Sequence, residues 1–245
     1  VPLVEIVSRP CMHSAKEATA YAKAIKAIAE YIEVSDCQLE EGSFRMDTNV
    51  SVRLRSETTY RNKIEVKNIN SFAHMEMAIE DQINKQIAAY EAEPAKDPLT
   101  IIKGATARFD LKTKSTHIMR SKEGASDYRY CIEPNLPPLH VSEELVASIK
   151  QDLPELPHAR QTRYTKTLGL TPYFADLLVS QKPLSDYFEK ALAYTQHAEE
   201  LCKWVAIEFV GRLKDVGLDL PTSDVPPKHI AILVNLLIDK TITGR

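Results

Sequence analysis

The segment RMDTNVSVRL at residues 45–54 alternates apolar and polar side chains with a period of two. Because successive side chains of a strand point to opposite faces, this alternation predicts a strand with one apolar and one polar face. The polar side carries Arg45, Asp47 and Asn49. Two interpretations stay open, since these side chains would either face solvent or line a site for a phosphate and a metal ion.

A second alternating segment, NKIEVKNI, ends at residue 69 and leads into a predicted helix over residues 72–90. Asn70 or Ser71 would cap that helix, because a side-chain oxygen there accepts a hydrogen bond from a free backbone N–H group. The polar residues of the segment and of the junction are Glu65, Lys67, Asn68 and Asn70. They would form either a solvated strand face or an anion site at a helix N-terminus.

Apolar spacing and turn residues predict further elements in the first half of the chain. Residues 1–7 are expected to form a strand in which Glu5 stands alone among apolar residues. A helix over residues 14–32 is expected to begin at a capping box of Ser14 and Glu17. The remaining predicted elements are a pair of strands over residues 36–54 that turns near Gly42 and a hairpin over residues 105–121 that turns near residues 112–114.

The character of the chain changes near Ser142, after which helical patterns alternate with short loops. We therefore expect an α+β domain over residues 1–148 and an all-α domain over residues 149–245. The chain begins at Val1 rather than at a Met, and a helical pattern runs almost to Arg245. From these two features we expect a piece of a longer protein.

Composition narrows the possible classes of protein. The formal net charge is -3, so any contact with nucleic acid would use a local patch rather than a uniformly basic surface. The 4 cysteines lack the spacing of a zinc site and are expected to be reduced, as in a cytoplasmic protein. No apolar run reaches the ~18 residues that a membrane span needs, so no membrane contact is expected. The 7 glycines include no P-loop motif, so a nucleotide would need another kind of site.

A third polar cluster lies in MRSKEGASDYRY at residues 119–130, which carries Arg120, Asp127 and Arg129. Carboxylates are hard oxygen ligands that suit Mg²⁺, whereas Arg and Lys suit phosphate oxygens. Together with the two alternating segments, this cluster favours a site that handles ATP and Mg²⁺ on the floor of a sheet. A salt-bridged structural corner is the alternative that the residues themselves leave open.

Five stretches of the chain carry a resemblance to a known family. They are PLVEIVS, SDCQLEEGSFRMDTNVSVR, KIEVKNINSF, MRSKEGASDYRYCIEPNLPPL and DLPELPHARQTRY. In this order they resemble the GatB family, which belongs to the bacterial aspartyl/glutamyl-tRNA amidotransferases. The resemblance implies an α+β fold, a glutamine-synthetase-like cradle around an antiparallel sheet, followed by an all-α helical domain. It also implies a longer protein, with further metal ligands upstream and a tail domain downstream that contacts tRNA.

The resemblance further implies a ligase that forms C–N bonds with glutamine as amido donor. Such proteins use ATP and Mg²⁺ to phosphorylate the side-chain carboxylate of misacylated Glu-tRNA(Gln) or Asp-tRNA(Asn), and ammonia then displaces the phosphate. The implied partners are the amidase subunit GatA, the small subunit GatC and the tRNA, in a cytoplasmic heterotrimer. The alternative function is a non-catalytic module that binds tRNA and the partner subunits.

Carried over residue by residue, the resemblance assigns roles to the polar clusters. Glu5 matches a metal-ligand carboxylate of the family. The residues that match the catalytic pocket are Arg45, Asp47, Asn49, Glu65 and Lys67. Those that match the ATP- and phosphate-binding segments are Asn68, Asn70, Arg120, Asp127 and Arg129. In the helical half, weak binding of tRNA is expected from the basic residues Arg160, Arg163, Lys166, Lys182, Lys190, Lys203, Arg212 and Lys214.

Overall fold

The computed structural model describes residues 3–121 and 135–244. Contacts between residues divide the chain into two compact units. The first comprises Val1–Lys26 and Ser35–Val141, and the second comprises Ala27–Val34 and Ser142–Arg245. The domain boundary expected between residues 148 and 149 falls inside helix α4 (Glu143–Asp152) and stays a prediction.

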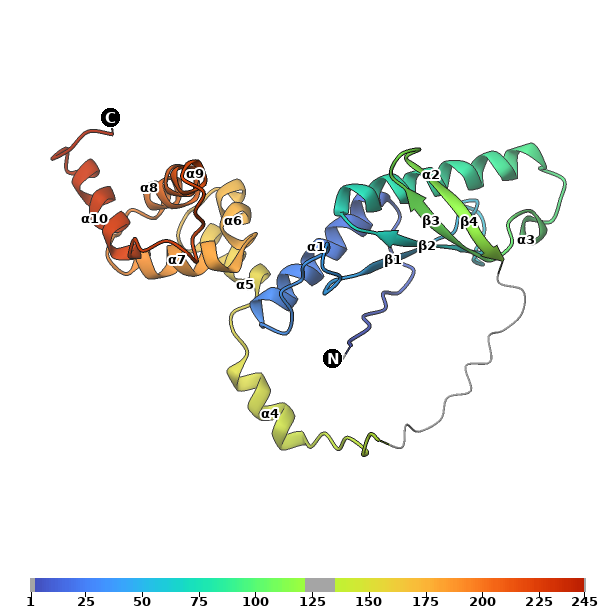
Figure 1. Cartoon of the computed structure of the whole chain (residues 1–245), viewed down its shortest axis with the longest axis horizontal. Helices are drawn as coiled ribbons and strands as arrows, with labels where there is room; N and C mark the ends of the chain where they lie inside the picture. The colour runs from blue at the N-terminus through green and yellow to red at the C-terminus, as the bar shows by residue number, and fades with distance from the viewer. Residues whose placement is uncertain (1–2, 122–134, 245) are drawn as a thin grey trace. The chain divides into compact units, whose positions relative to one another are not determined.

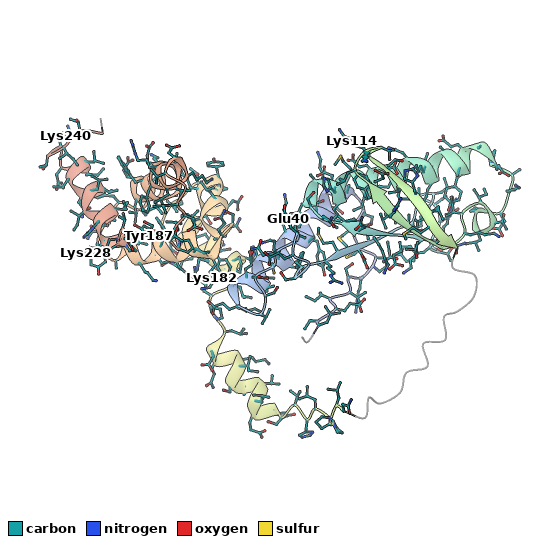
Figure 2. All side chains as sticks on the ribbon, in the orientation of Figure 1. Glu40, Lys114, Lys182, Tyr187, Lys228 and Lys240 are labelled. Carbon is teal, nitrogen blue, oxygen red and sulfur yellow. The ribbon has the colours of Figure 1, made fainter. Side chains whose placement is uncertain are left out.

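The first unit combines a four-stranded sheet with helices, which confirms the expected α+β class (Figure 1). Its strands are β1 (Met46–Val50), β2 (Ile64–Ile69), β3 (Ala105–Asp110) and β4 (Ser115–Ser121). Its helices are α2 (Phe72–Ala92), α3 (Pro98–Ile101) and most of α1 (Ala15–Tyr31), whose last residues belong to the second unit. The predicted hairpin is confirmed by β3 and β4, and Lys114, labelled in Figure 2, lies in their turn.

The expectation of an antiparallel sheet is wrong for one pair of strands. The order is β1-β2-β3-β4, and β2 runs parallel to β3, whereas the two outer pairs are antiparallel. The reason lies in the connection, because the 21-residue helix α2 carries the chain from the end of β2 back to the start of β3. A crossover of this length joins parallel strands, whereas a tight turn joins antiparallel ones.

Helices cover one face of this sheet and bury the apolar side of the strands (Figure 1). Val66 and Ala107 on the central strands and Ala78 on α2 are completely buried in one apolar cluster. The small side chains of Ala15 and Ala18 bring the first turns of α1 into the same cluster. The opposite side of the strands is therefore the polar face.

Both predicted helix starts are confirmed. In α1, Glu17 N donates to Ser14 Oγ at 3.1 Å, and Glu17 Oε2 accepts from His13 N at 2.6 Å. In α2, the cap is Ser71, the second of the two candidates, because its hydroxyl accepts a hydrogen bond from His74 N at 3.1 Å. Each cap satisfies backbone N–H groups that have no partner inside the helix.

Two predicted strands are wrong. Residues 3–9 form no strand, and residues 36–41 lead into a turn at Gly42, whose φ is 76°. A strand needs a neighbouring strand for its backbone hydrogen bonds, and no described strand pairs with either segment. The strand predicted over residues 45–54 is confirmed only for Met46–Val50, because the backbone beyond it bonds to a helix side chain instead.

The second unit is helical throughout its described residues, as predicted. Its helices are α4 (Glu143–Asp152), α5 (Pro157–Lys166), α6 (Pro172–Val179), α7 (Lys182–Leu192), α8 (Ala198–Lys203), a π-helical segment (Trp204–Phe209), α9 (Val210–Asp215) and α10 (Pro227–Ile238). Phe188, Leu201 and Val234 are completely buried in its core. Tyr187, labelled in Figure 2, donates to Val225 O at 3.0 Å, and burial raises its pKa to about 12.

A search of the described helices for a membrane span found none that is both long enough and apolar enough.

Candidate catalytic site on the polar face of the sheet

Strand pairing places polar side chains of neighbouring strands next to each other. Asn49 of β1 lies opposite Glu65 of β2, and Glu65 lies opposite Thr106 of β3. One step along the same face, Lys67 of β2 lies opposite Arg108 of β3. Neighbouring strands are ~4.8 Å apart, so side chains in such positions are within reach of one another.

Lys67 lies between two carboxylates. Its Nζ is 3.3 Å from Asp47 Oδ2 and 3.4 Å from Glu65 Oε1. The antiparallel pairing of β1 and β2 brings these carboxylates, which are distant in sequence, to one point. Attraction by Asp47 is the largest cause that raises the pKa of Lys67, and Glu65 adds to it against the opposing effect of burial. Lys67 is therefore charged at neutral pH and holds the two carboxylates together.

Asn68 interrupts the pairing of β1 with β2. The register shifts between Met46 and Thr48, and Asn68 has a φ of 66°, a left-handed conformation that Asn adopts more readily than most residues. The extra residue forms a β-bulge, so Lys67 and Asn68 are both exposed before Ile69 returns to the buried side. Two consecutive polar residues in IEVKNI were the sequence signal for this bulge.

Three further predicted residues lie at the margins of the polar face. Asn49 is exposed opposite Glu65. Arg45 precedes β1, and its Nε donates to Gly42 O at 3.1 Å, so it closes the turn before the strand. Asn70 is exposed directly before the cap of α2. The chemical roles expected of these three residues stay predictions.

Two residues of β3 belong to this face but were missed as site residues. Thr106 is only 4% exposed, and its Oγ1 donates to Glu65 Oε2 at 3.4 Å. Arg108 is exposed beside Lys67. The signal was present in the sequence, because ATARFD alternates and places Thr106, Arg108 and Asp110 on one side. The prediction of the hairpin did not extend to this polar side.

Asp47 and Glu65 suit a magnesium ion that arrives with a phosphate ligand. Mg²⁺ commonly takes one or two protein carboxylates together with phosphate oxygens and water. The two carboxylates already converge on one cation, the ammonium group of Lys67. Within residues 3–121 and 135–244, no three His, Cys, Asp or Glu side chains gather to form an all-protein metal site. The donor set therefore fits a metal shared with a nucleotide.

Four predicted site residues remain outside this described cluster. Glu5 is exposed in a segment without regular structure. Arg120 lies in β4, where its backbone position is opposite Thr106. Asp127 and Arg129 fall outside the described residues. The metal role of Glu5 and the phosphate roles of the other three therefore stay predictions.

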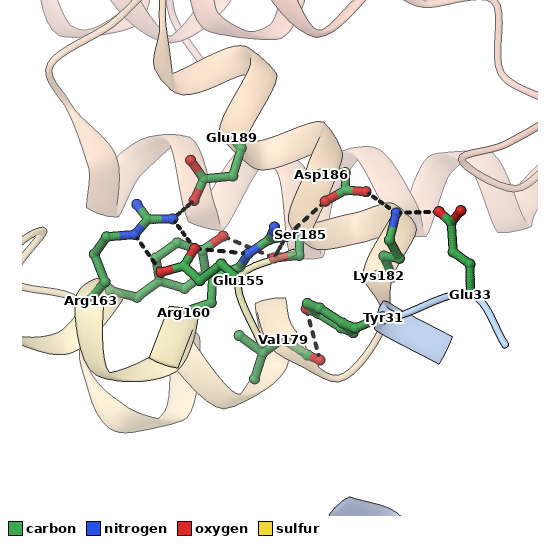
Figure 3. Close-up of polar contacts among 11 residues, drawn as sticks. Tyr31, Glu33, Glu155, Arg160, Arg163, Val179, Lys182, Ser185, Asp186 and Glu189 are labelled. Carbon is green, nitrogen blue, oxygen red and sulfur yellow. Dashed lines mark hydrogen bonds and ion pairs between the residues drawn. The ribbon is translucent and has the colours of Figure 1, made fainter. Parts of the chain in front are cut away.

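Charged residues of the second unit form a tighter cluster, shown in Figure 3. Arg163 Nη2 lies 2.8 Å from Glu155 Oε2 and 2.6 Å from Glu189 Oε1. Arg160 Nη1 lies 2.7 Å from Asp186 Oδ1, and the Arg160 side chain is only 12% exposed. Within this cluster, each of the two guanidinium groups is matched by carboxylates.

The same cluster extends to the segment Ala27–Val34, which belongs to the second unit (Figure 3). Lys182 Nζ lies 2.9 Å from both Glu33 Oε1 and Asp186 Oδ2. Tyr31 donates to Val179 O at 3.2 Å. The basic residues that this cluster holds are Arg160, Arg163 and Lys182. The expectation that these three offer free charge to tRNA is wrong, because partly buried charges are compensated inside the protein.

The pKa values of the carboxyl groups reflect this compensation. Hydrogen bonding to Arg163 is the largest cause that lowers the pKa of Glu155, and it outweighs burial. Burial alone would raise the pKa of Asp186, but hydrogen bonds from Lys182 and Arg160 reverse the direction and lower it. Both carboxyl groups are therefore ionised at neutral pH and bound to their cations.

Comparison with known proteins relates both units to one kind of protein. Residues 1–147 match the GatB/GatE catalytic domain family, and residues 186–245 match a GatB domain. The chain is 51% identical over 244 residues to the GatB-type subunit of the aspartyl/glutamyl-tRNA(Asn/Gln) amidotransferase of Protochlamydia amoebophila, of which it covers 49%. It is 46% identical over 245 residues to the protein of the same name from Chlamydia caviae, of which it covers 50%. The matches span 100% of this chain but about half the length of these curated relatives.

Proposed function

Because the chain belongs to the GatB/GatE catalytic domain family, we propose that it provides the ATP-dependent site of a tRNA amidotransferase. The proposed substrates are ATP with Mg²⁺ and misacylated Glu-tRNA(Gln) or Asp-tRNA(Asn). The proposed partners are the amidase subunit GatA, which supplies ammonia from glutamine, and the small subunit GatC, in the cytoplasm. A glutamine-synthetase-like cradle is part of the proposal, with the polar face of the sheet as its floor.

The proposed reaction has two steps. A carboxylate oxygen of the aminoacyl group attacks the γ-phosphorus of ATP, the bond from that phosphorus to the bridging oxygen breaks, and ADP leaves. Ammonia then attacks the carbonyl carbon of the acyl phosphate, phosphate leaves, and the nitrogen loses a proton to give the amide. The first step spreads negative charge over the phosphoryl oxygens, so it depends on positioning and on nearby positive charge.

The described residues divide this work between them. Asp47 and Glu65 would hold the Mg²⁺ ion, which when bound supplies positive charge to the phosphoryl oxygens. Lys67 holds the two carboxylates at one point, and Thr106 fixes Glu65 from the next strand. The N-terminus of α2, directly after Asn70, offers backbone N–H groups to an anion.

One observation carries the proposal, namely the convergence of Asp47 and Glu65 on Lys67 on an open face. The side chains of Lys67 and Asp47 are 45% and 47% exposed, so a ligand from solvent can reach them. A cluster built only for stability would be closed and buried. This openness supports an exchange in which a metal ion takes over the position between the two carboxylates.

The test is Asp47→Asn in the assembled amidotransferase, with labelled ATP and Glu-tRNA(Gln) as substrates. We expect formation of ADP and of amidated tRNA to fall by about 100-fold or more, because the neutral amide is a poor Mg²⁺ ligand. Hydrolysis of glutamine by the amidase without tRNA should be unchanged. The control is Glu91→Gln, since Glu91 is an exposed carboxylate on α2.

Amidation at the normal rate by the Asp47→Asn enzyme would remove Asp47 from the proposed site. The assay also separates the alternative function, a module that only binds tRNA and partner subunits. In that case the wild-type assembly would bind tRNA, and its formation of ADP would not depend on any polar residue of this sheet.

A further inference from the structure

The two permanent cations on the described polar face of the sheet differ in their surroundings. Lys67 lies between Asp47 and Glu65, so this trio carries one more negative than positive charge. Arg108, on the neighbouring strand, forms no ion pair within residues 3–121 and 135–244. An anion that approaches this face is therefore repelled by the net charge of the trio and attracted by Arg108.

The position of Arg108 follows from the pairing of β2 with β3. Arg108 lies opposite Lys67 in the parallel register, and its neighbours Ala107 and Phe109 are buried on the other side of the sheet. Its guanidinium group therefore leaves the same face as the ammonium group of Lys67. Asp110, two residues further on this side, accepts a hydrogen bond from Lys112 N at 2.8 Å and belongs to the turn.

Other cationic side chains near this face are engaged elsewhere. Arg45 donates to the backbone of the turn at Gly42. His117, opposite Arg108 on β4, shares a hydrogen bond with Thr113 at 3.2 Å. Among the described side chains, Arg108 is thus the permanent charge that remains available beside the two carboxylates.

We propose that Arg108 binds the terminal phosphate groups of the nucleotide, next to the metal position between Asp47 and Glu65. This inference rests on the proposed function and adds the residue that recognises the phosphates. A guanidinium group presents planar donors that match two phosphate oxygens, which a single ammonium group does not. The face would then hold a metal–phosphate unit from both sides, with carboxylates on the cation and Arg108 on the anion.

The experiment measures binding of nucleotides to the full chain by calorimetry. The ligands are Mg²⁺-ATP and AMP, because AMP lacks the terminal phosphates. The variants are Arg108→Met, which removes the charge but keeps an unbranched side chain, and Arg108→Lys, which keeps the charge but loses the planar donors. Arg55→Met is the matched control, since Arg55 is exposed in the loop after β1. Thermal unfolding of each variant verifies that it is folded.

We expect Arg108→Met to weaken binding of Mg²⁺-ATP by about 10-fold to 100-fold, as for loss of a charged hydrogen bond. Arg108→Lys should have an intermediate affinity, and Arg55→Met should equal the wild type. Binding of AMP should be the same for all four proteins.

Two outcomes overturn the inference, and they are distinguishable. If the wild type binds Mg²⁺-ATP and Arg108→Met binds it equally well, Arg108 has no phosphate role, while the proposed function stands. If the wild type binds no nucleotide, ATP handling by this chain is refuted, and the role of Arg108 is refuted with it. An equal loss in Arg55→Met would show a general effect of charge and would also count against Arg108.

Discussion

Each unit of the chain contains a cation held between two carboxylates, and the two arrangements differ in tightness. On the sheet, Lys67 lies 3.3 Å and 3.4 Å from its partners, and its side chain is 45% exposed. In the helical unit, Arg163 lies 2.8 Å and 2.6 Å from its partners, beside Arg160, which is 12% exposed (Figure 3). The open cluster can exchange its cation for a ligand, whereas the closed one would leave charges unpaired.

The comparison shows that residue type alone does not distinguish a chemical site from a structural one. Both clusters consist of Lys or Arg with Asp and Glu, and both raise the pKa of their cations. Burial decides the difference, because a buried ion pair is costly to break, whereas an exposed pair contributes little to stability. The following variants test this distinction.

The largest effect is expected from Arg160→Met in the helical unit. Arg160 binds Asp186 and Ser185 and lies over the ring of Tyr31, so its loss leaves a carboxylate without its cation. The free energy of unfolding of this unit should fall by about 3–5 kcal/mol. Denaturation by urea, followed by circular dichroism, measures it. Lys190→Met on the exposed side of α7 is the control and should change stability by less than ~0.5 kcal/mol. A loss from Arg160→Met no larger than that of the control would show that the cluster is not structural.

A smaller effect is expected from acid. The pKa values of Glu155 and Asp186 are lower in the folded protein than their ordinary values of 4.5 and 3.8. Their stabilisation is therefore complete above those ordinary values and is lost as the pH falls through the lower, folded values. Urea denaturation between pH 7 and pH ~2.5 should show the helical unit losing stability below about pH 4.5. Arg163→Met should flatten this dependence, and an unchanged pH profile in that variant would contradict the assignment.

The smallest effect on stability is expected from Lys67→Met on the sheet. An exposed ion pair contributes at most about 1 kcal/mol, so the free energy of unfolding of the first unit should change by less than that. The same urea denaturation measures it. A loss comparable to that expected of Arg160→Met would remove the difference between the two clusters and would identify Lys67 as a structural residue.

Helix α2 shows where reasoning from spacing reached its limit. Its extent and its cap were predictable, because both depend on residues within a few positions of one another. The apolar stripe was expected to include Ile87, yet Ile87 is 38% exposed and Gln86 is 1% exposed. Gln86 donates to Val50 O at 3.0 Å and accepts from Val52 N at 3.1 Å, so it bonds the backbone where β1 ends. Nothing in the helical period indicates this role, since the partner lies 34 or more residues away.

The sequence by itself determined the local elements and the composition of the polar face. Alternation placed Asp47, Glu65 and Lys67 on polar sides of strands, and capping residues located the starts of α1 and α2. Only the tertiary structure decided that β2 and β3 run parallel and that Arg108 stands beside Lys67. Periodicity and caps act between residues a few positions apart, whereas strand pairing joins residues about 20–40 positions apart through backbone groups that every residue shares. The same pairing brought the two carboxylates to one point, and burial closed the cluster of Arg160 while that of Lys67 stayed open.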